Sequence, residues 1–175
     1  PRGRKQYLVV IKGLEESGPF VLTLKGSGAM AFESFRDKDA VLSRFANTVI
    51  RAANAASDAA AKKAGNGGGK RWPYRAFWLP VGAARDEKGA PIYVEVGKGS
   101  NTTNVVLPAA LGLPDKPEQV DLKRFYVGGD LLTRVNELYD ASAEWRAAWE
   151  NIKPGAVEGN GGAEPDAAAD KEREA

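Results

Sequence analysis

The sequence predicts an α+β fold, in which a small antiparallel sheet of five to six strands packs on one helix and a C-terminal amphipathic helix follows. Short runs of β-branched and aromatic residues, separated by glycine and proline, recur up to residue 107. One stretch before residue 65 and another after residue 130 place apolar residues at helical spacing. These three observations carry the prediction.

The composition excludes several classes of function. The chain has no cysteine and no histidine, which rules out disulfides, zinc sites built on those residues, and Cys–His or Ser–His–Asp catalysis. No apolar run approaches the roughly 18 residues of a membrane span. The basic start leads into only a few apolar residues, so it does not predict a signal peptide. We therefore expect a cytoplasmic protein without a metal, a cofactor or a membrane partner.

The first elements are short. Residues 1–5 (PRGRK) are predicted to form a basic arm. Strands are expected over residues 7–12 and 20–25, joined by a turn at Gly18-Pro19. The second strand alternates apolar and other residues, and a third strand is expected over residues 29–35.

A helix is expected next, with Asp37 or Asp39 as its cap. Its apolar stripe consists of Val41, Leu42, Phe45, Val49 and Ala53. The second half is rich in alanine, which favours helix but buries little surface. Lys62 and Lys63 complement the dipole at the end of this helix, and Gly65 stops it.

The middle of the chain predicts a hairpin. Residues 65–69 (GNGGG) form a flexible connector, and residues 74–81 and 91–97 form two strands around a turn at residues 86–89. Pro80 indicates an edge or a bulge. A further short strand is expected over residues 104–107.

A long helix is expected within residues 121–153, starting near Asp121 or Asp130. Its apolar positions alternate in steps of four and three residues, as in a heptad repeat. Such a helix either joins two copies of the chain or packs on its own core, since both uses give nearly the same pattern. We expect a homodimer whose contact residues are Leu131, Val135, Leu138, Trp145, Trp149 and Ile152.

Charge is distributed unevenly along the chain. Residues 1–75 carry 14 basic and 6 acidic side chains, residues 76–153 carry 9 and 11, and residues 154–175 carry 2 and 6. The last segment has almost no bulky apolar residue, so we expect it to be a disordered acidic tail that recruits a protein partner. A basic front and an acidic tail are common in proteins that bind nucleic acid, although chance bias in a solvated surface gives the same picture.

The stretch from Lys62 to Trp78 combines a glycine hinge, cations and aromatic rings. A strand over residues 74–81 would carry aromatic rings on both faces, so one face is expected to lie exposed and to stack on bases. The alternative is that a helix covers each face. The predicted nucleic-acid-binding residues are Lys62, Lys63, Lys70, Arg71, Trp72, Tyr74, Arg75, Phe77 and Trp78.

This layout resembles that of ThermoDBP, a family of archaeal single-stranded-DNA-binding proteins of the Thermoproteales. The parts that carry the resemblance are a β-rich first domain over residues 6–120, the helix over residues 131–152 and the acidic tail. The resemblance implies a basic, aromatic-lined cleft, dimerisation through the C-terminal helix, protection of exposed DNA during replication and repair, and no catalysis.

We therefore expect a non-enzymatic protein that binds single-stranded DNA, largely without regard to sequence. Two alternatives stay open, namely an RNA-binding protein and a structural or assembly protein such as a virion or scaffold subunit. No paired acids or bases in the sequence predict a catalytic site.

Overall fold

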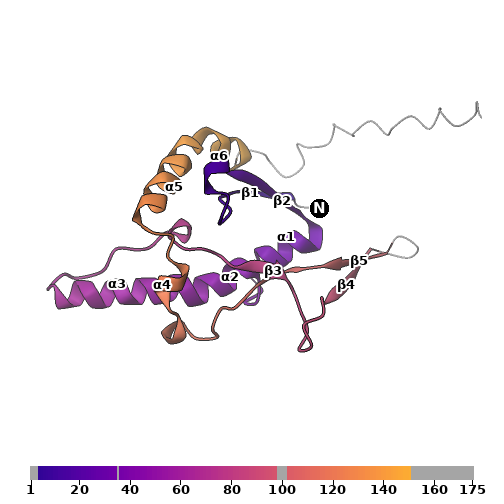
Figure 1. Cartoon of the computed structure of the whole chain (residues 1–175), viewed down its shortest axis with the longest axis horizontal. Coiled ribbons are helices and arrows are strands. Elements are labelled where there is room, and N and C mark those ends of the chain that lie inside the picture. Colours follow the sequence, from indigo (N-terminus) through magenta and orange to yellow (C-terminus); the bar gives the residue numbers. More distant parts are fainter. Residues whose placement is uncertain (1–3, 35, 98–101, 151–175) are drawn as a thin grey trace, which may run out of the picture. The chain divides into compact units, whose positions relative to one another are not determined.

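The computed structural model describes residues 4–34, 36–97 and 102–150 (Figure 1). The class is α+β, as predicted, with several helices and small antiparallel sheets. Two compact units are present, one of residues 2–140 and one that starts at Ala141. No helix in the described part of the chain is both long and apolar enough to cross a bilayer.

The strands of the described residues form three two-stranded sheets, β1–β2, β3–β6 and β4–β5, so the prediction of one sheet of five to six strands is wrong. The first sheet pairs β1 (Arg4–Val9) with β2 (Phe20–Lys25), in the register that sets Val9 opposite Phe20. Side chains along β2 alternate between partly buried and exposed, as the sequence predicted. β1 begins earlier than expected, so Arg4 and Lys5 belong to this strand and not to a basic arm.

A helix, α1 (Gly26–Phe32), replaces the third strand predicted over residues 29–35. Gly26 takes a positive φ of 53° and turns the chain out of β2. Ala29 and Phe32 are then buried three residues apart, which is the spacing of one helix face. Over so short a run, helical and strand spacing were not distinguishable from the sequence.

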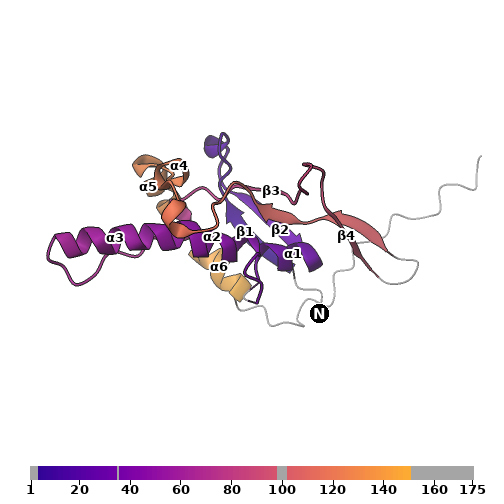
Figure 2. The same cartoon turned by 90° about the horizontal axis from the view of Figure 1, so that it is seen from below.

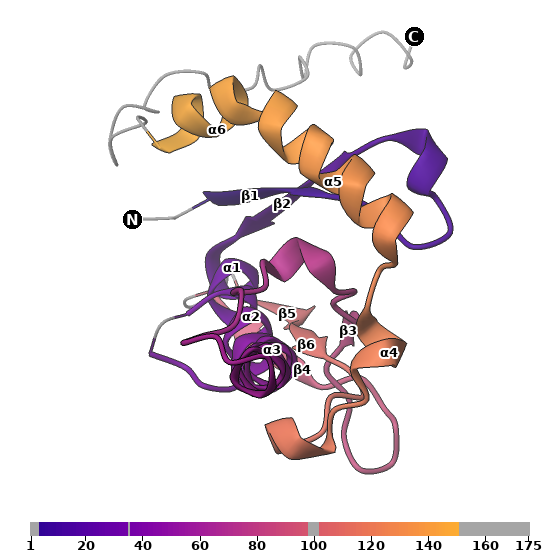
Figure 3. The same cartoon turned by 90° about the vertical axis from the view of Figure 1, so that its left-hand side faces the viewer.

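One long helix runs through α2 (Val41–Phe45), the π-helical turn η2 (Ala46–Ile50) and α3 (Arg51–Lys63). Figure 3 looks along it, with α3 seen end-on. Val41, Phe45, Val49 and Ala53 of the predicted apolar stripe are buried, whereas Leu42 is only partly so. The helix ends after Lys63, with Gly65 at a φ of 75°. The predicted acidic cap is wrong, because Ala40 precedes the helix without a side-chain cap and Asp37 instead accepts from the Asp39 backbone N–H.

The predicted strand over residues 74–81 is also wrong. The 3-10 turn η3 (Tyr74–Ala76) comes first, and only β3 (Val81–Ala83) is a strand. The backbone between them pairs with a segment distant in the sequence, because the Trp78 N–H donates to the Phe125 carbonyl at 2.7 Å. Sequence spacing could not reveal this partner.

The remaining strands build one ribbon. β5 (Thr103–Val106) and β6 (Pro108–Ala110) follow each other directly, and they pair in turn with β4 (Tyr93–Val96) and β3. Between β3 and β4 the chain makes an excursion, closed by a bridge between Arg85 and Pro91. Strands were correctly predicted near residues 91–97 and 104–107. The predicted partner of residues 91–97 was the segment 74–81, whereas in the structure β4 pairs with β5 (Figure 2).

The chain ends in shorter helices than predicted. After η4 (Pro117–Gln119), Asp121 caps the single turn α4 (Leu122–Phe125), and α5 (Gly129–Ala141) follows. The start near Asp130 is confirmed, because Asp130 lies in the first turn of α5, but the helix is interrupted at Ser142 and α6 (Ala143–Glu150) follows in the second unit. Of the predicted contact residues, Leu131, Val135, Leu138 and Trp145 are partly buried. The Trp149 side chain, Ile152 and the predicted tail lie outside the described residues.

The main core lies between the long helix and the irregular second half of the chain, and not between a sheet and a helix as expected. Phe45, Val49, Ile50 and Ala53 of the long helix pack on Ala76, Phe77, Leu113 and Phe125. The compact unit therefore reaches past residue 120, the predicted domain boundary, and includes α4 and most of α5.

The burial of Phe77 gives a first test. Phe77→Ala should lower the free energy of unfolding by about 3–5 kcal/mol, because it leaves a cavity in the core. Urea denaturation followed by circular dichroism measures this, with Met30→Ala, whose side chain is 67% exposed, as the control that changes little. A loss for Phe77→Ala no larger than that of the control would contradict this core.

Candidate nucleic-acid interface

Two polar side chains on α3 hold the chain that returns from the glycine-rich connector. Asn54 accepts from the Trp72 backbone N–H at 2.9 Å. One helical turn later, Asp58 accepts from the Gly69 backbone N–H at 3.0 Å and from the Arg71 guanidinium at 2.9 Å. These bonds, first that from Gly69 and then that from Arg71, lower the pKa of the Asp58 carboxyl. The sequence offered a signal that we missed, since these two polar residues are four apart in an alanine-rich helix.

The last glycine of the connector has a steric role as well. A Cβ on Gly69 would lie 2.3 Å from the Ser57 carbonyl carbon and 2.5 Å from the Asp58 nitrogen, both backbone atoms. Only glycine lets the two backbones approach this closely. By contrast, a Cβ on Gly67 or Gly68 would meet nothing within 4 Å. The connector therefore combines a hinge with a fixed contact.

This return brings four of the predicted cations to the C-terminal end of α3. Lys62, Lys63 and Lys70 are exposed, and none of them has an ion pair among the described residues. Arg71 is also exposed but pairs with Asp58. A positive surface results, although the two terminal lysines also complement the helix dipole.

The predicted aromatic residues divide between core and surface. Phe77 is only 7% exposed and belongs to the core, so its ring is not free to stack on a base. Trp72 is partly buried, and its ring centroid lies 5.8 Å from that of Phe77 and 6.0 Å from that of Tyr126. Tyr74 is 48% exposed, with its ring beside that of Phe45.

Arg75 and Trp78 point to other neighbours. The Arg75 guanidinium donates to the Asn136 side chain at 2.7 Å and lies 4.1 Å from the centroid of the Tyr139 ring, so it binds α5. Trp78 is partly buried, with the Lys12 ammonium 6.0 Å from its ring centroid. The predicted site residues therefore do not form one face of a strand.

A second basic–aromatic segment lies against the first. Residues 70–74 read KRWPY and residues 123–126 read KRFY. The backbone that follows segment 70–74 pairs antiparallel with the end of segment 123–126. Phe77 and Tyr126 form a β-bridge, and the Val127 N–H donates to the Ala76 carbonyl. Sequence reasoning missed the second segment, although the repeated order of Lys, Arg and an aromatic residue was visible.

The second segment adds rings and charge next to Trp72. Tyr126 is 37% exposed, and Lys123 and Arg124 are exposed, without an ion pair among the described residues. An open hollow of about 330 Å³ adjoins Arg124, lined also by Gln119, Leu113 and Phe125. No three acidic side chains of the described residues gather into a group that could hold a metal ion.

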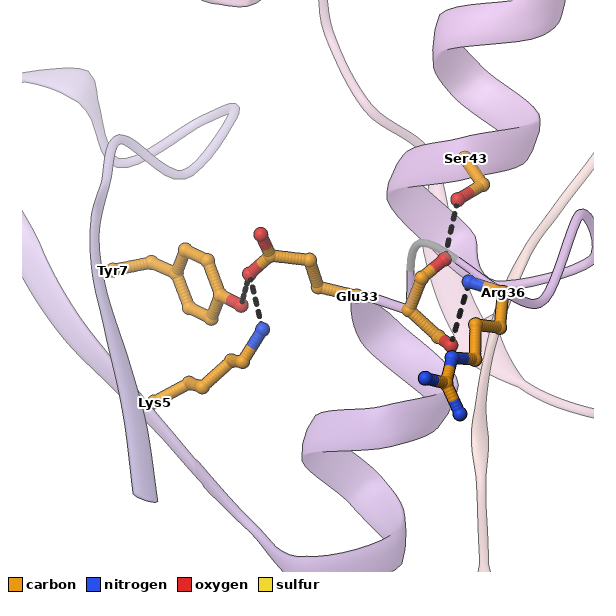
Figure 4. Close-up of polar contacts among 6 residues, drawn as sticks. Lys5, Tyr7, Glu33, Arg36 and Ser43 are labelled. Carbon is orange, nitrogen blue, oxygen red and sulfur yellow. Dashed lines mark hydrogen bonds and ion pairs between the residues drawn. The ribbon is translucent and has the colours of Figure 1, made fainter. Parts of the chain in front are cut away.

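A separate polar cluster ties β1 to the end of α1 (Figure 4). The Glu33 carboxylate accepts from the Tyr7 hydroxyl at 2.5 Å and pairs with the Lys5 ammonium at 3.0 Å. Burial raises the pKa of Glu33, but these two partners outweigh it, and the pKa lies below its ordinary value. Burial, and then the bond to Glu33, raise the pKa of Tyr7. The Tyr7 ring packs on Phe32, which gives the cluster a structural role.

No protein-family model, curated protein or solved structure matches this chain. The resemblance to the ThermoDBP proteins therefore stays a prediction.

The glycine contact predicts a difference between two neighbouring substitutions. Gly69→Ala should lower the free energy of unfolding by about 1–3 kcal/mol, because the new Cβ forces the returning chain off α3. Gly67→Ala should leave it unchanged or raise it by up to about 1 kcal/mol, since there is space and the unfolded chain loses freedom. Urea denaturation of both variants measures the difference, and equal midpoints would contradict the contact.

The polar cluster predicts a dependence on pH. The low pKa of folded Glu33 means that its contribution to stability is present above its ordinary pKa and is lost as the pH falls through the folded pKa. Glu33→Gln should therefore be less stable than the wild type at pH 7, and the gap should close as the solution is acidified. Urea denaturation across pH measures this, with the exposed Glu118→Gln as control. A gap that persists at low pH would contradict the assignment.

Proposed function

We propose that this chain binds single-stranded nucleic acid, DNA in preference to RNA, largely without regard to sequence and without catalysis. One observation carries the proposal, namely the contact between the two basic–aromatic segments, 70–74 and 123–126. This contact sets the partly exposed rings of Trp72 and Tyr126 next to each other. In each segment a Lys-Arg pair comes just before the aromatic residues.

This combination suits a single strand for physical reasons. Unpaired bases present apolar faces that stack on aromatic rings, and each stacked base contributes about 1–3 kcal/mol. Lysine and arginine that have no acidic partner can bind phosphates and release counterions, which makes the affinity depend on salt. A duplex hides its base faces, so exposed rings favour a single strand.

The proposed contact residues differ in part from those predicted. Trp72, Tyr74 and Tyr126 would supply the rings, while Phe77 would support them from the core. Lys70, Lys123 and Arg124, which have no acidic partner among the described residues, would bind the nearest phosphates, and Lys62 and Lys63 those further along the strand. Arg71, which pairs with Asp58, would contribute only where a phosphate replaces that carboxylate. Trp78 with Lys12 would form a secondary contact, and Arg75 would orient α5.

Two further parts of the proposal concern the C-terminal end of the chain. The partly buried Leu131, Val135 and Leu138 of α5 would contribute to a dimer, as predicted from their heptad spacing. The acidic residues 154–175 would recruit a protein partner or compete with nucleic acid for the cations. Neither part is needed for the contact between the two basic–aromatic segments.

Binding of a labelled oligo(dT) measured by anisotropy over a salt series tests the proposal. The log–log slope should be about −0.7 for each phosphate contacted, and Lys123→Gln should reduce it by about that amount. Tyr126→Ala should weaken binding by about 5- to 150-fold, the equivalent of about 1–3 kcal/mol for one stacked base.

Met30→Ala removes a large side chain that is 67% exposed and belongs to neither basic–aromatic segment, so it serves as the control, with unchanged affinity expected. Oligo(U) in the same assay measures the preference for DNA. Absent or salt-independent binding would reject nucleic-acid binding itself. Binding that Tyr126→Ala leaves unchanged would reject this surface.

A further inference from the structure

One half of the strand ribbon has no cover among the described residues. β6 packs against α1 and α2. β4 and β5 pair with each other, and no other described element packs extensively against them. Ile92, Tyr93, Val94 and Val106 are all exposed large apolar residues, and Val94 is 37% exposed. A two-stranded ribbon alone is marginally stable in water, so this half of the ribbon would gain from a partner.

The outer edge of β4 is open to pairing. Its N–H and C=O groups on the side away from β5 have no strand partner among the described residues. Proteins usually block such an edge with proline, lysine or a bulge. β4 reads YVEV and contains no proline, lysine or bulge, so its length of four residues and the charge of Glu95 are the protections that it has.

The charge of the ribbon decides between classes of partner. Residues 91–97 and 102–107 contain a single charged side chain, Glu95. Such a surface does not attract phosphate, which argues against nucleic acid here. A strand that pairs with this edge should be apolar, and it should not place a carboxylate opposite Glu95. β4 of a second copy is apolar, and it meets the second condition in any register that does not set Glu95 opposite Glu95.

Symmetry then limits the register. Residues in an antiparallel pair lie directly opposite each other, so the two-fold axis that relates two identical strands lies midway between the two copies of one residue. An axis at Glu95 would oppose two carboxylates. An axis at Val94 sets Tyr93 against Glu95 of the second copy and Ile92 against Val96 of the second copy. The Tyr93 hydroxyl can then donate to that carboxylate, and the apolar side chains share one face.

We propose that β4 is a self-association edge, where two copies of this chain pair antiparallel with Val94 on the two-fold axis. The proposal is independent of nucleic-acid binding, since it uses none of the residues of the two basic–aromatic segments.

Cross-linking tests the register directly, because the natural chain has no cysteine. Directly opposed Cα atoms in an antiparallel pair lie about 4.5–5.5 Å apart, within the range of a disulfide. Val94→Cys should therefore form a disulfide-linked dimer on mild oxidation. In this register the two copies of residue 93, or of residue 95, are offset along the strand and lie about 8 Å apart, too far for a disulfide. Tyr93→Cys and Glu95→Cys should stay unlinked, and equal linking of all three variants, or none with Val94→Cys, would overturn the proposal.

Sedimentation equilibrium of the full chain gives a second measurement. Val94→Lys places two like charges on the axis and should halve the mass of the assembly, or raise its dissociation constant at least about tenfold. Thr103→Lys adds the same charge on the other strand of the ribbon and should leave the mass unchanged. A wild-type mass of one copy, or an unchanged mass in Val94→Lys, would overturn the proposal. Because Val94→Cys changes little volume, it decides the question even if Val94→Lys disturbs the ribbon.

Discussion

The close approach of the returning chain to the long helix is the constraint on which the rest of this structure depends. Residues 69–78 contain little regular secondary structure, so their backbone groups need partners elsewhere. Asn54 and Asp58 supply partners on one side, and the backbone near Phe125 supplies them on the other. The short side chains of Ala53 and Ala76 are fully buried in the core between these elements, where larger ones would hold them apart.

The sequence predicted those elements whose pattern is local and long. The stripe of Val41, Phe45 and Val49 spans several turns, and only a helix buries such spacing on one side. The strand over residues 74–81 failed for the opposite reason. Its aromatic residues alternate over only a few positions, and a partner some fifty residues away decides the conformation of Phe77 and Trp78. No local rule contains that contact.

The same limit applies to the candidate site. Lys70 to Trp72 stood out because cations and rings are adjacent in sequence, whereas Tyr126 became significant only when the fold set its ring beside Trp72. The prediction that one ring-bearing face lies exposed assumed a flat strand with rings on both faces, and a 3-10 turn at Tyr74–Ala76 removes that assumption. The turn sends Phe77 into the core and Arg75 towards α5, so residues that are neighbours in the sequence take different roles.

Nucleic-acid binding and self-association need surfaces of different chemistry, and this chain places them on different segments. A phosphate surface needs cations that stay hydrated and unpaired, as at Lys70 and Lys123, and such groups repel a second copy of themselves. An edge for strand pairing needs the reverse, and the described part of β4 and β5 has one charge. Pairing two copies through β4, which uses none of the residues of the two basic–aromatic segments, would bring two such surfaces into one assembly. Two linked sites on one strand bind more tightly than either alone, so self-association would serve binding through avidity and not through a new contact.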